Sequence, residues 1–302
     1  MAMDLSKSYE YFQPEKVEAR INIVGCGSVG ATLAENLVRL GITNLALWDM
    51  DVVNPHNLAN QIFRQQDIGR PKVEALADIL FEINPEIKDD LKLYGKGWSG
   101  QQLSGYVFLC VDNIELRRQI VEKHFDNPYV KAMLDFRTLL ESAQHYAADW
   151  SDYKRKKDLL NSMNFSHEEA SEETPVSACG VTLGVAPTVR AICALGVANF
   201  VNFIRGKGLK KLIILDAFNF MLNKDNEITV GHKKKRQFQS MLYNYITDKR
   251  KGISWPREDI QTMQGLHSYY RMVEPETIDA IVKHTNEKME TDVLRLIKDD
   301  LR

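Results

Sequence analysis

The segment that decides the fold is Ile-Asn-Ile-Val-Gly-Cys-Gly-Ser-Val-Gly, at residues 21–30. A short apolar run predicts a buried strand, and a Gly-x-Gly-x-x-Gly turn follows it at Gly25, Gly27 and Gly30. In such a turn the first glycine permits the tight bend, the second lets a phosphate approach the backbone, and the third lets a helix pack closely. The helix N-terminus then offers N–H groups to an anion. The motif predicts a nucleotide site; the alternative interpretation is a tight turn without a ligand.

Predicted helices and strands alternate along the chain after this turn. Leucines at helical spacing follow it, and residues 44–48 predict a second buried strand, which completes one βαβ unit. The alternation predicts an α/β fold with a doubly wound, mostly parallel sheet and a Rossmann-like nucleotide-binding half. Further helices are expected at 70–83, about 114–125 and 181–204, and further strands at 91–94, 106–111, 129–134 and 212–215.

The domain organisation follows from a change in composition along the chain. Residues 149–178 are polar and charged, and they predict a surface excursion with one short helix. We therefore expect one nucleotide-binding domain over residues 1–220, with a crossover loop at about 149–180. Residues 221–302 are expected to form a small C-terminal extension, mixed or helical, that ends in a helix over 276–301.

The overall composition excludes several classes of protein. The 302 residues are 44% hydrophobic and 26% charged, which excludes a disordered or fibrous chain. The net charge of −2 argues against a polycation that binds nucleic acid. The first residues lack the apolar run of a signal peptide, and the apolar stretch 181–204 is interrupted by polar residues, which predicts a buried helix rather than a membrane span. We therefore expect a cytoplasmic protein.

An acidic residue ends the second predicted strand. Asp49 follows Gly25 by 24 residues, and a carboxylate at this position accepts hydrogen bonds from ribose hydroxyls. Because NAD and ATP both carry a ribose, these residues alone leave an NAD-dependent oxidoreductase open.

The segment after Asp49 carries a more specific pattern. It runs from Asp49-Met-Asp51 through Asn57-Leu-Ala-Asn-Gln61 to Gly-Arg-Pro-Lys72. This resembles the ThiF/MoeB/HesA family of adenylating enzymes related to ubiquitin-activating enzyme, whose pattern is Asp-x-Asp-x-Val, Asn-Leu-x-Arg-Gln and Gly-x-x-Lys. Asp-Asn followed by an arginine at 112–117, and the glycine-containing helix at 181–204, continue the resemblance, which covers about residues 18–220. The two Cys-x-x-Cys zinc pairs of many relatives are absent from the sequence, which is typical of a compact branch.

The resemblance implies a reaction. A carboxylate would attack the α-phosphate of ATP, with Mg²⁺ as cofactor, to give an acyl-adenylate and pyrophosphate. The carboxylate would be the C-terminus of a ubiquitin-like or sulfur-carrier protein, and the family implies a homodimer. Besides the oxidoreductase, two alternatives stay open. One is a nucleotide-binding partner protein that has lost catalysis. The other is a cyclic dehydration enzyme acting on RNA, which only the basic cluster 232–236 supports.

The resemblance also assigns roles to residues on this segment. Asp49 matches the ribose-binding acid, and its neighbour Asp51 is expected to orient the loop. Asn57 and Gln61 match the loop that lines the phosphates. Lys72 matches the lysine that reaches the phosphates; the alternative is a solvated lysine in the first turn of a helix.

Two further positions carry the expected charge chemistry. Asp112 matches the metal-binding aspartate, and its alternative role is a strand-end cap. Asn60 stands where the family has an arginine, which removes a cation from the phosphate site. If this segment is helical, Arg64 lies one turn further along the same face and could restore that charge. The family also often has an arginine in the N-terminal arm, and residues 1–19 contain none.

One of the four cysteines is a candidate nucleophile. Many relatives carry a cysteine before the long helix, which accepts the activated acyl group. Cys179, in Ser-Ala-Cys-Gly, matches that position, and the dipole of the following helix would favour its thiolate. The alternative is a small residue packed at a helix start. The other three, Cys26, Cys110 and Cys193, are expected in the core.

Overall fold

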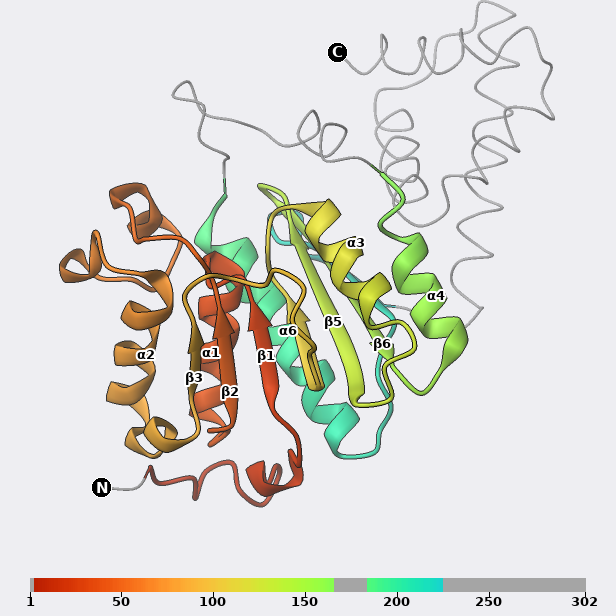
Figure 1. The fold of residues 1–302 in the computed structure, drawn as a ribbon, viewed down its shortest axis with the longest axis horizontal. Helices are drawn as coiled ribbons and strands as arrows, with labels where there is room; N and C mark the ends of the chain where they lie inside the picture. Colours follow the sequence, from red (N-terminus) through yellow and green to blue (C-terminus); the bar gives the residue numbers. More distant parts are fainter. Residues whose placement is uncertain (1–2, 166–183, 225–302) are drawn as a thin grey trace, which may run out of the picture. The chain divides into compact units, whose positions relative to one another are not determined.

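The computed structural model describes residues 3–165 and 184–224 of the chain (Figure 1). The chain divides into two units, Met1–Asp225 and Asn226–Arg302, of which the second lies outside the described residues. Most of the predicted C-terminal extension and part of the predicted crossover loop, including Cys179, therefore also lie outside them.

The described strands form one eight-stranded sheet, in the order β3-β2-β1-β4-β5-β6-β7-β8. The first five in this order are parallel, and each strand from β6 onward is antiparallel to the one before it. Because β1 lies between β2 and β4, the chain reverses its direction of winding there, and such a switch point opens a crevice at the carboxyl ends of the strands. The strands are β1 Ile21–Val24, β2 Leu45–Trp48, β3 Lys92–Tyr94, β4 Gly105–Leu109, β5 Val130–Thr138, β6 Ser142–Asp149, β7 Leu212–Asp216 and β8 Met221–Lys224.

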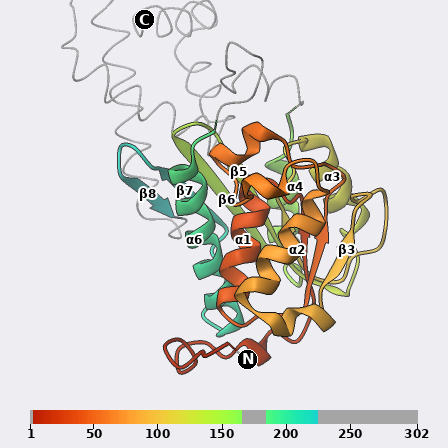
Figure 2. The ribbon, with the colours of Figure 1, turned by 90° about the vertical axis from the view of Figure 1, so that its left-hand side faces the viewer.

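Helices cover both faces of the sheet, and each face has its own apolar core. Residues of α1, α2 and α6 pack together on one face, and residues of α3 and α4 on the other (Figures 1 and 2). This arrangement confirms the predicted doubly wound α/β fold. The helices are α1 Ser28–Arg39, α2 Lys72–Ile83, α3 Ile114–Lys123, α4 Tyr153–Asn161 and α6 Ala186–Ile204.

The structure departs from the sequence prediction after Asp135. The predicted strand ends at that residue, whereas β5 continues to Thr138 and turns back as β6, which the sequence pattern did not reveal. The reason is that Asp135 is fully buried and lies between two arginine side chains, so its charge does not end the strand. The short edge strand β8 was also not predicted.

The long apolar helix packs inside the fold. Among the described residues, α6 alone is long and apolar enough to cross a membrane, a test that core helices of soluble proteins also pass. It contacts α1, β5, β6 and β7. A Cβ on Gly196 would lie 2.2 Å from the Phe136 ring, so the helix fits against β5 at van der Waals distance. Its neighbour Cys193 is buried, as is Cys26, and Cys110 is partly buried.

Candidate active site

The glycine loop joins β1 to α1 in a closely packed turn. Gly25 has a φ of +95°, and a Cβ there would lie 2.8 Å from the Cys110 carbonyl carbon at the end of β4. A Cβ on Gly30 would lie 1.8 Å from the Gly25 oxygen. Both positions therefore require glycine, for the bend and for the close approach of the helix, as the motif predicts.

Gly27 differs from the other two glycines of the motif. It is the N-cap of α1, and a Cβ there would meet nothing within 4 Å. No side chain of the described residues caps this helix. The open space in front of a helix N-terminus fits a phosphate, which the first N–H groups and the helix dipole would attract.

Asp49 links the glycine loop to the end of β2. Its carboxylate accepts hydrogen bonds from the Cys26 N–H at 2.6 Å and the Asp51 N–H at 2.8 Å. Burial raises the pKa of Asp49, against these hydrogen bonds and the charge of Lys72, which lower it. The preceding residue, Trp48, stacks on Tyr94 with ring centroids 3.6 Å apart. The predicted ribose acid therefore lies against the predicted phosphate loop.

Lys72 is the first residue of α2 and points back to the same loop. Its Nζ lies 2.8 Å from Asp51 Oδ2, and its backbone N–H donates to the Asp51 carbonyl at 2.9 Å. The lysine side chain is largely buried whereas Asp51 is exposed. Lys72 is therefore not a solvated surface lysine. Its ammonium group binds the carboxylate of Asp51, and the Asp51 N–H donates to the carboxylate of Asp49, which contacts the glycine loop.

The loop from Asn54 to Gln61 is shaped by its own amide groups. Asn57 is buried, and its Oδ1 accepts the Asn54 N–H at 2.9 Å. Gln61 Oε1 is buried and has no hydrogen-bond partner among the described residues. Asn60 Nδ2 donates to the Gly184 carbonyl at 3.5 Å, just before α6. Because a buried polar atom without a partner is costly, the Gln61 amide marks a place where a ligand would supply one.

The structural premise for Arg64 is wrong. The short 3-10 helix Pro55–Ala59 ends before Asn60, and Arg64 instead precedes a second short 3-10 helix, so no helical turn relates the two residues. The guanidinium of Arg64 binds Glu82 at 2.7 Å and Asp67 at 3.1 Å. A direct role of Arg64 at the phosphates stays a prediction.

Asp112 lies in the turn between β4 and α3. It is exposed, and no hydrogen bond or ion pair joins it to another of the described residues. The cap of α3 is Asn113, whose Oδ1 accepts the Leu116 N–H at 3.0 Å, so Asp112 is not that cap. No cluster of three metal-ligating side chains occurs in the described ranges. One free carboxylate is nevertheless the usual protein contribution to Mg²⁺ bound by a nucleotide.

Sequence reasoning missed a buried cluster beside Asp112, formed by Arg117, Asp135 and Arg137. Arg117 Nη1 and Arg137 Nε each bind one oxygen of the Asp135 carboxylate, the second at 2.7 Å. Arg117 appears in the family motif without a role. A signal did exist, since residues two apart on a strand share one face, which places Asp135 and Arg137 together.

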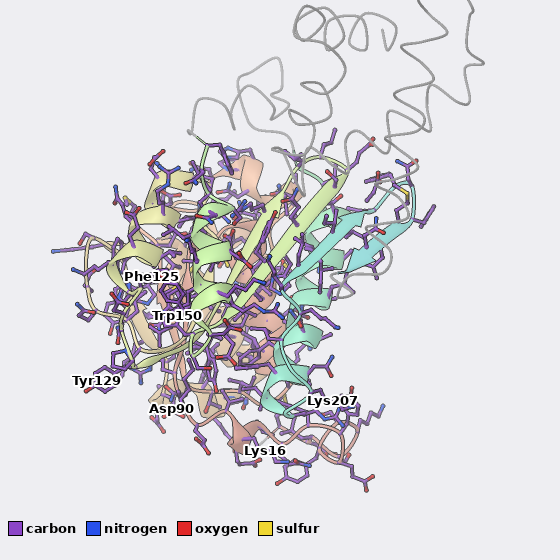
Figure 3. The ribbon with its side chains drawn as sticks, turned by 90° about the vertical axis from the view of Figure 1, so that its right-hand side faces the viewer. Lys16, Asp90, Phe125, Tyr129, Trp150 and Lys207 are labelled. Carbon is purple, nitrogen blue, oxygen red and sulfur yellow. The ribbon has the colours of Figure 1, made fainter. Side chains whose placement is uncertain are left out.

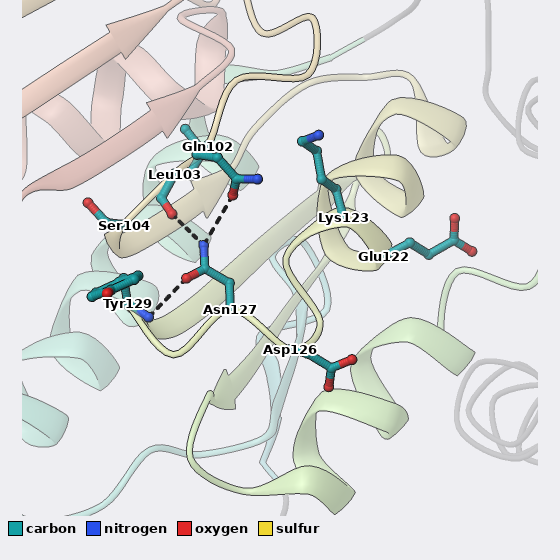
Figure 4. Close-up of a pocket in the computed structure, with 8 residues that line it drawn as sticks. All are labelled: Gln102, Leu103, Ser104, Glu122, Lys123, Asp126, Asn127 and Tyr129. Carbon is teal, nitrogen blue, oxygen red and sulfur yellow. Dashed lines mark hydrogen bonds between the residues drawn. The ribbon is translucent and has the colours of Figure 1, made fainter.

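Two surface grooves of the described part of the chain lie at the opposite ends of the strands from the glycine loop. One of about 530 Å³ is lined by Gln102–Ser104, Asn127 and Tyr129 and by the end of α3 (Figure 4). One of about 760 Å³ includes Trp150, which packs against Phe125 (Figure 3). Both lie where β4 and β5 begin, whereas the glycine loop, Asp49 and Asp112 follow strand ends.

A glycine turn after β1, an acid after β2 and the reversal of winding between β1 and β4 define a Rossmann-like fold. The model of the ThiF family matches residues 5–237, and the chain belongs to this family.

Curated relatives agree with the family. The chain is 32% identical over 133 residues to ubiquitin-like modifier-activating enzyme 5 of Caenorhabditis briggsae, which covers 39% of this chain and 30% of that protein. It is 33% identical over 134 residues to the same enzyme of Drosophila persimilis, a match that covers 39% of this chain and 34% of that protein. The chain thus spans about a third of the length of these curated relatives.

Two solved structures share the fold. E. coli MccB with ATP aligns with a TM-score of 0.55 and 18% identity over 70% of this chain and 65% of that chain. PaaA aligns with a TM-score of 0.54 and 17% identity over 74% and 68%.

Proposed function

We propose that this protein is an ATP-dependent adenylyltransferase that activates a carboxylate. The observation that carries the proposal is the meeting of the glycine loop, Asp49 and Lys72 at one edge of the sheet, linked by hydrogen bonds of 2.6 to 2.9 Å. Membership of the ThiF family and the shared fold with MccB, whose structure with ATP is solved, support the choice of ATP over NAD.

Residues of different charge would bind different parts of ATP. Asp49 would accept hydrogen bonds from the ribose hydroxyls, and the N-terminus of α1 at Gly27 would receive phosphate oxygens. Lys72 would leave its contact with Asp51 and neutralise phosphate charge instead. A substrate carboxylate oxygen then bonds to the α-phosphorus while the bond to the pyrophosphate oxygen breaks, which releases pyrophosphate and leaves an acyl-adenylate.

Mg²⁺ fits the free carboxylate of Asp112, which would hold it together with phosphate oxygens. When bound, the ion neutralises charge on the phosphates and so stabilises the leaving pyrophosphate. Asn57 would act indirectly by shaping the loop, and the open amide of Gln61 would meet the nucleotide.

We propose as substrate the C-terminal carboxylate of a ubiquitin-like or small carrier protein. The named relatives are activating enzymes for ubiquitin-like modifiers, and MccB has been crystallised with MccA. We further propose a cytoplasmic homodimer, and Cys179 as the acceptor of the activated acyl group.

One observation favours a second function, a nucleotide-binding partner protein without catalysis. Asn60 replaces the family arginine, and Arg64 is already bound by Asp67 and Glu82. A site with fewer cations would bind ATP yet stabilise the departing pyrophosphate poorly. Binding without turnover is the result that would identify it.

The test is a thermal-shift titration with Mg·ATP, ATP plus chelator, and NAD. Mg·ATP at a hundred times its Kd is expected to stabilise the protein by about 2.7 kcal/mol. We expect Lys72→Ala and Asp112→Ala to reduce this effect, and the matched control Lys123→Ala, at the opposite ends of the strands, to retain it. Stabilisation by NAD alone would contradict the proposal. ATP–pyrophosphate exchange with a carrier protein ending in Gly-Gly then separates catalysis from binding.

A further inference from the structure

The backbone just before Asp112 is held by a side chain of the following helix. The Val111 carbonyl accepts hydrogen bonds from Arg117 Nε, at 2.7 Å, and from Arg117 Nη2. This carbonyl belongs to the peptide bond between Val111 and Asp112, so its direction sets the direction of the Asp112 backbone. No hydrogen bond or ion pair joins the carboxylate of Asp112 to other described residues, and its aim therefore depends on the backbone.

Arg117 is itself fixed from the neighbouring strand. Its Nη1 binds Asp135 Oδ1 and donates to the Phe136 carbonyl at 2.7 Å. The guanidinium is buried and the Asp135 carboxylate is completely buried. One planar guanidinium thus joins two backbone carbonyls and one carboxylate, an arrangement that a lysine could not reproduce.

Asp135 has a second cation on its other oxygen. Arg137 Nε donates to Oδ2 at 2.7 Å, and the remaining nitrogens of Arg137 donate to the Ser162 carbonyl at 2.7 Å and the Ser162 hydroxyl at 2.9 Å. Burial alone would raise the pKa of Asp135, but the two guanidinium groups lower it below its ordinary value. The aspartate is therefore a charged centre that connects the end of β4 to the end of α4.

We infer that Asp135 is a positioning residue for the proposed metal site: by holding Arg117 against the Val111 carbonyl, it fixes the backbone that aims the Asp112 carboxylate. The inference rests on the proposed function of Asp112. It assigns to Arg117, Asp135 and Arg137 a role that acts through the backbone before Asp112. A loosened Asp135 would let the peptide before Asp112 rotate, which would weaken metal binding and leave metal-free ATP binding unchanged.

The experiment compares Asp135→Asn with a matched control, Asp67→Asn. Asp67 is also a completely buried aspartate between two arginines, Arg64 and Arg70, but it lies on the loop that leads to Lys72. Two quantities are measured on the full chain: hydrogen exchange of the amides at 110–113, and the affinity for Mn²⁺ with a non-hydrolysable ATP analogue, by electron paramagnetic resonance.

We expect Asp135→Asn to speed exchange at 110–113 about tenfold and to weaken Mn²⁺ binding about tenfold, a loss of about 1.4 kcal/mol. The affinity for the analogue in chelator should stay within about twofold, by the same conversion of affinity into free energy. Asp67→Asn should leave the exchange at 110–113 unchanged, because Asp67 binds Arg64 and Arg70 on the loop before Lys72 and has no contact with the backbone before Asp112.

Arg117→Lys keeps the positive charge and removes the planar guanidinium. It replaces Asp135→Asn as the test variant if that protein does not fold. Unchanged exchange, or faster exchange with unchanged Mn²⁺ affinity in a protein that binds the analogue, would overturn the inference. If the wild-type protein binds no analogue, the proposed function fails instead. Exchange at 110–113 still decides in that case whether Asp135 fixes this backbone.

Discussion

Two buried aspartates support the two loops of the candidate site, and they do so differently. Asp67 holds the loop before Lys72, and its arginines Arg64 and Arg70 are 32% and 37% exposed and end on surface carboxylates. Asp135 holds the loop of Asp112, and its arginines Arg117 and Arg137 are 7% and 17% exposed and end on backbone carbonyls.

The two clusters differ in the partners that the arginines keep when the aspartate is replaced by a neutral residue. Around Asp67, water and the surface carboxylates Glu82 and Asp78 still stabilise both guanidinium groups. Around Asp135, the guanidinium groups would keep only neutral partners in a buried place, where an uncompensated charge is costly. The same set of charges, one aspartate between two arginines, is therefore expected to contribute unequally to the free energy of unfolding at the two places.

The largest expected effect is on stability. Asp135→Asn should lower the free energy of unfolding by about 3–5 kcal/mol, since it breaks a buried ion pair from one side. Asp67→Asn should cost about 1–2 kcal/mol, because its hydrogen bonds are partly replaced by water. Urea unfolding followed by circular dichroism measures both, and equal losses would contradict the comparison.

A smaller effect should appear with pH, at a histidine in contact with Asp135. His145 is completely buried; its Nδ1 donates to the Asp135 carbonyl and its Nε2 accepts from Asn199. Burial lowers the pKa of His145 from 6.5 to about 4. Between these values the unfolded state binds a proton that the folded state does not. Stability therefore falls as the pH falls, by about 3 kcal/mol in total.

Urea unfolding between pH 7 and pH 4 measures this loss, with His145→Gln as the control. The variant removes the His145 ring and should make the curve less steep over this range, leaving the contribution of His124, whose pKa is also lowered by burial. A wild-type curve that is as flat as that of the variant would show that His145 is not held neutral.

The smallest effect concerns the outer partners of Asp67. Glu82→Gln should lower stability by about 1 kcal/mol or less, and 1 M salt should remove the difference, because the Arg64–Glu82 pair is exposed to solvent. Thermal unfolding at low and high salt measures it. A salt-independent loss would place this pair in the same class as the buried cluster around Asp135.

Sequence patterns predicted the part of the fold that forms from residues close together in the chain. The run before Gly25, the helix after it and the acid at Asp49 share one local unit, and the structure confirms their arrangement. The 3-10 helix after Pro55 was not predicted, so the geometry expected for Arg64 was wrong. Local patterns do not distinguish a short 3-10 turn from an α-helix in a loop of mixed residues.

The part that was missed depends on contacts between distant residues. Asp135 looks like a strand end because a buried charge is improbable without partners, and its partner Arg117 lies 18 residues earlier on a helix. Once Asp135 is paired, β5 can continue and β6 can return beside it. Asp112 is a candidate taken from the family motif, and the hydrogen bonds to the backbone before it became visible only in three dimensions.

The stack of Trp48 on Tyr94 gives this protein an optical signal of its own. The indole lies in ring contact with a phenol, and the next residue in the chain is Asp49. Indole emission depends on its immediate surroundings, so a nucleotide bound at Asp49, as proposed, would change the fluorescence of this one tryptophan. Replacing Trp98, Trp150 and Trp255 with phenylalanine would isolate that emission, and occupancy could then be followed in real time without a label.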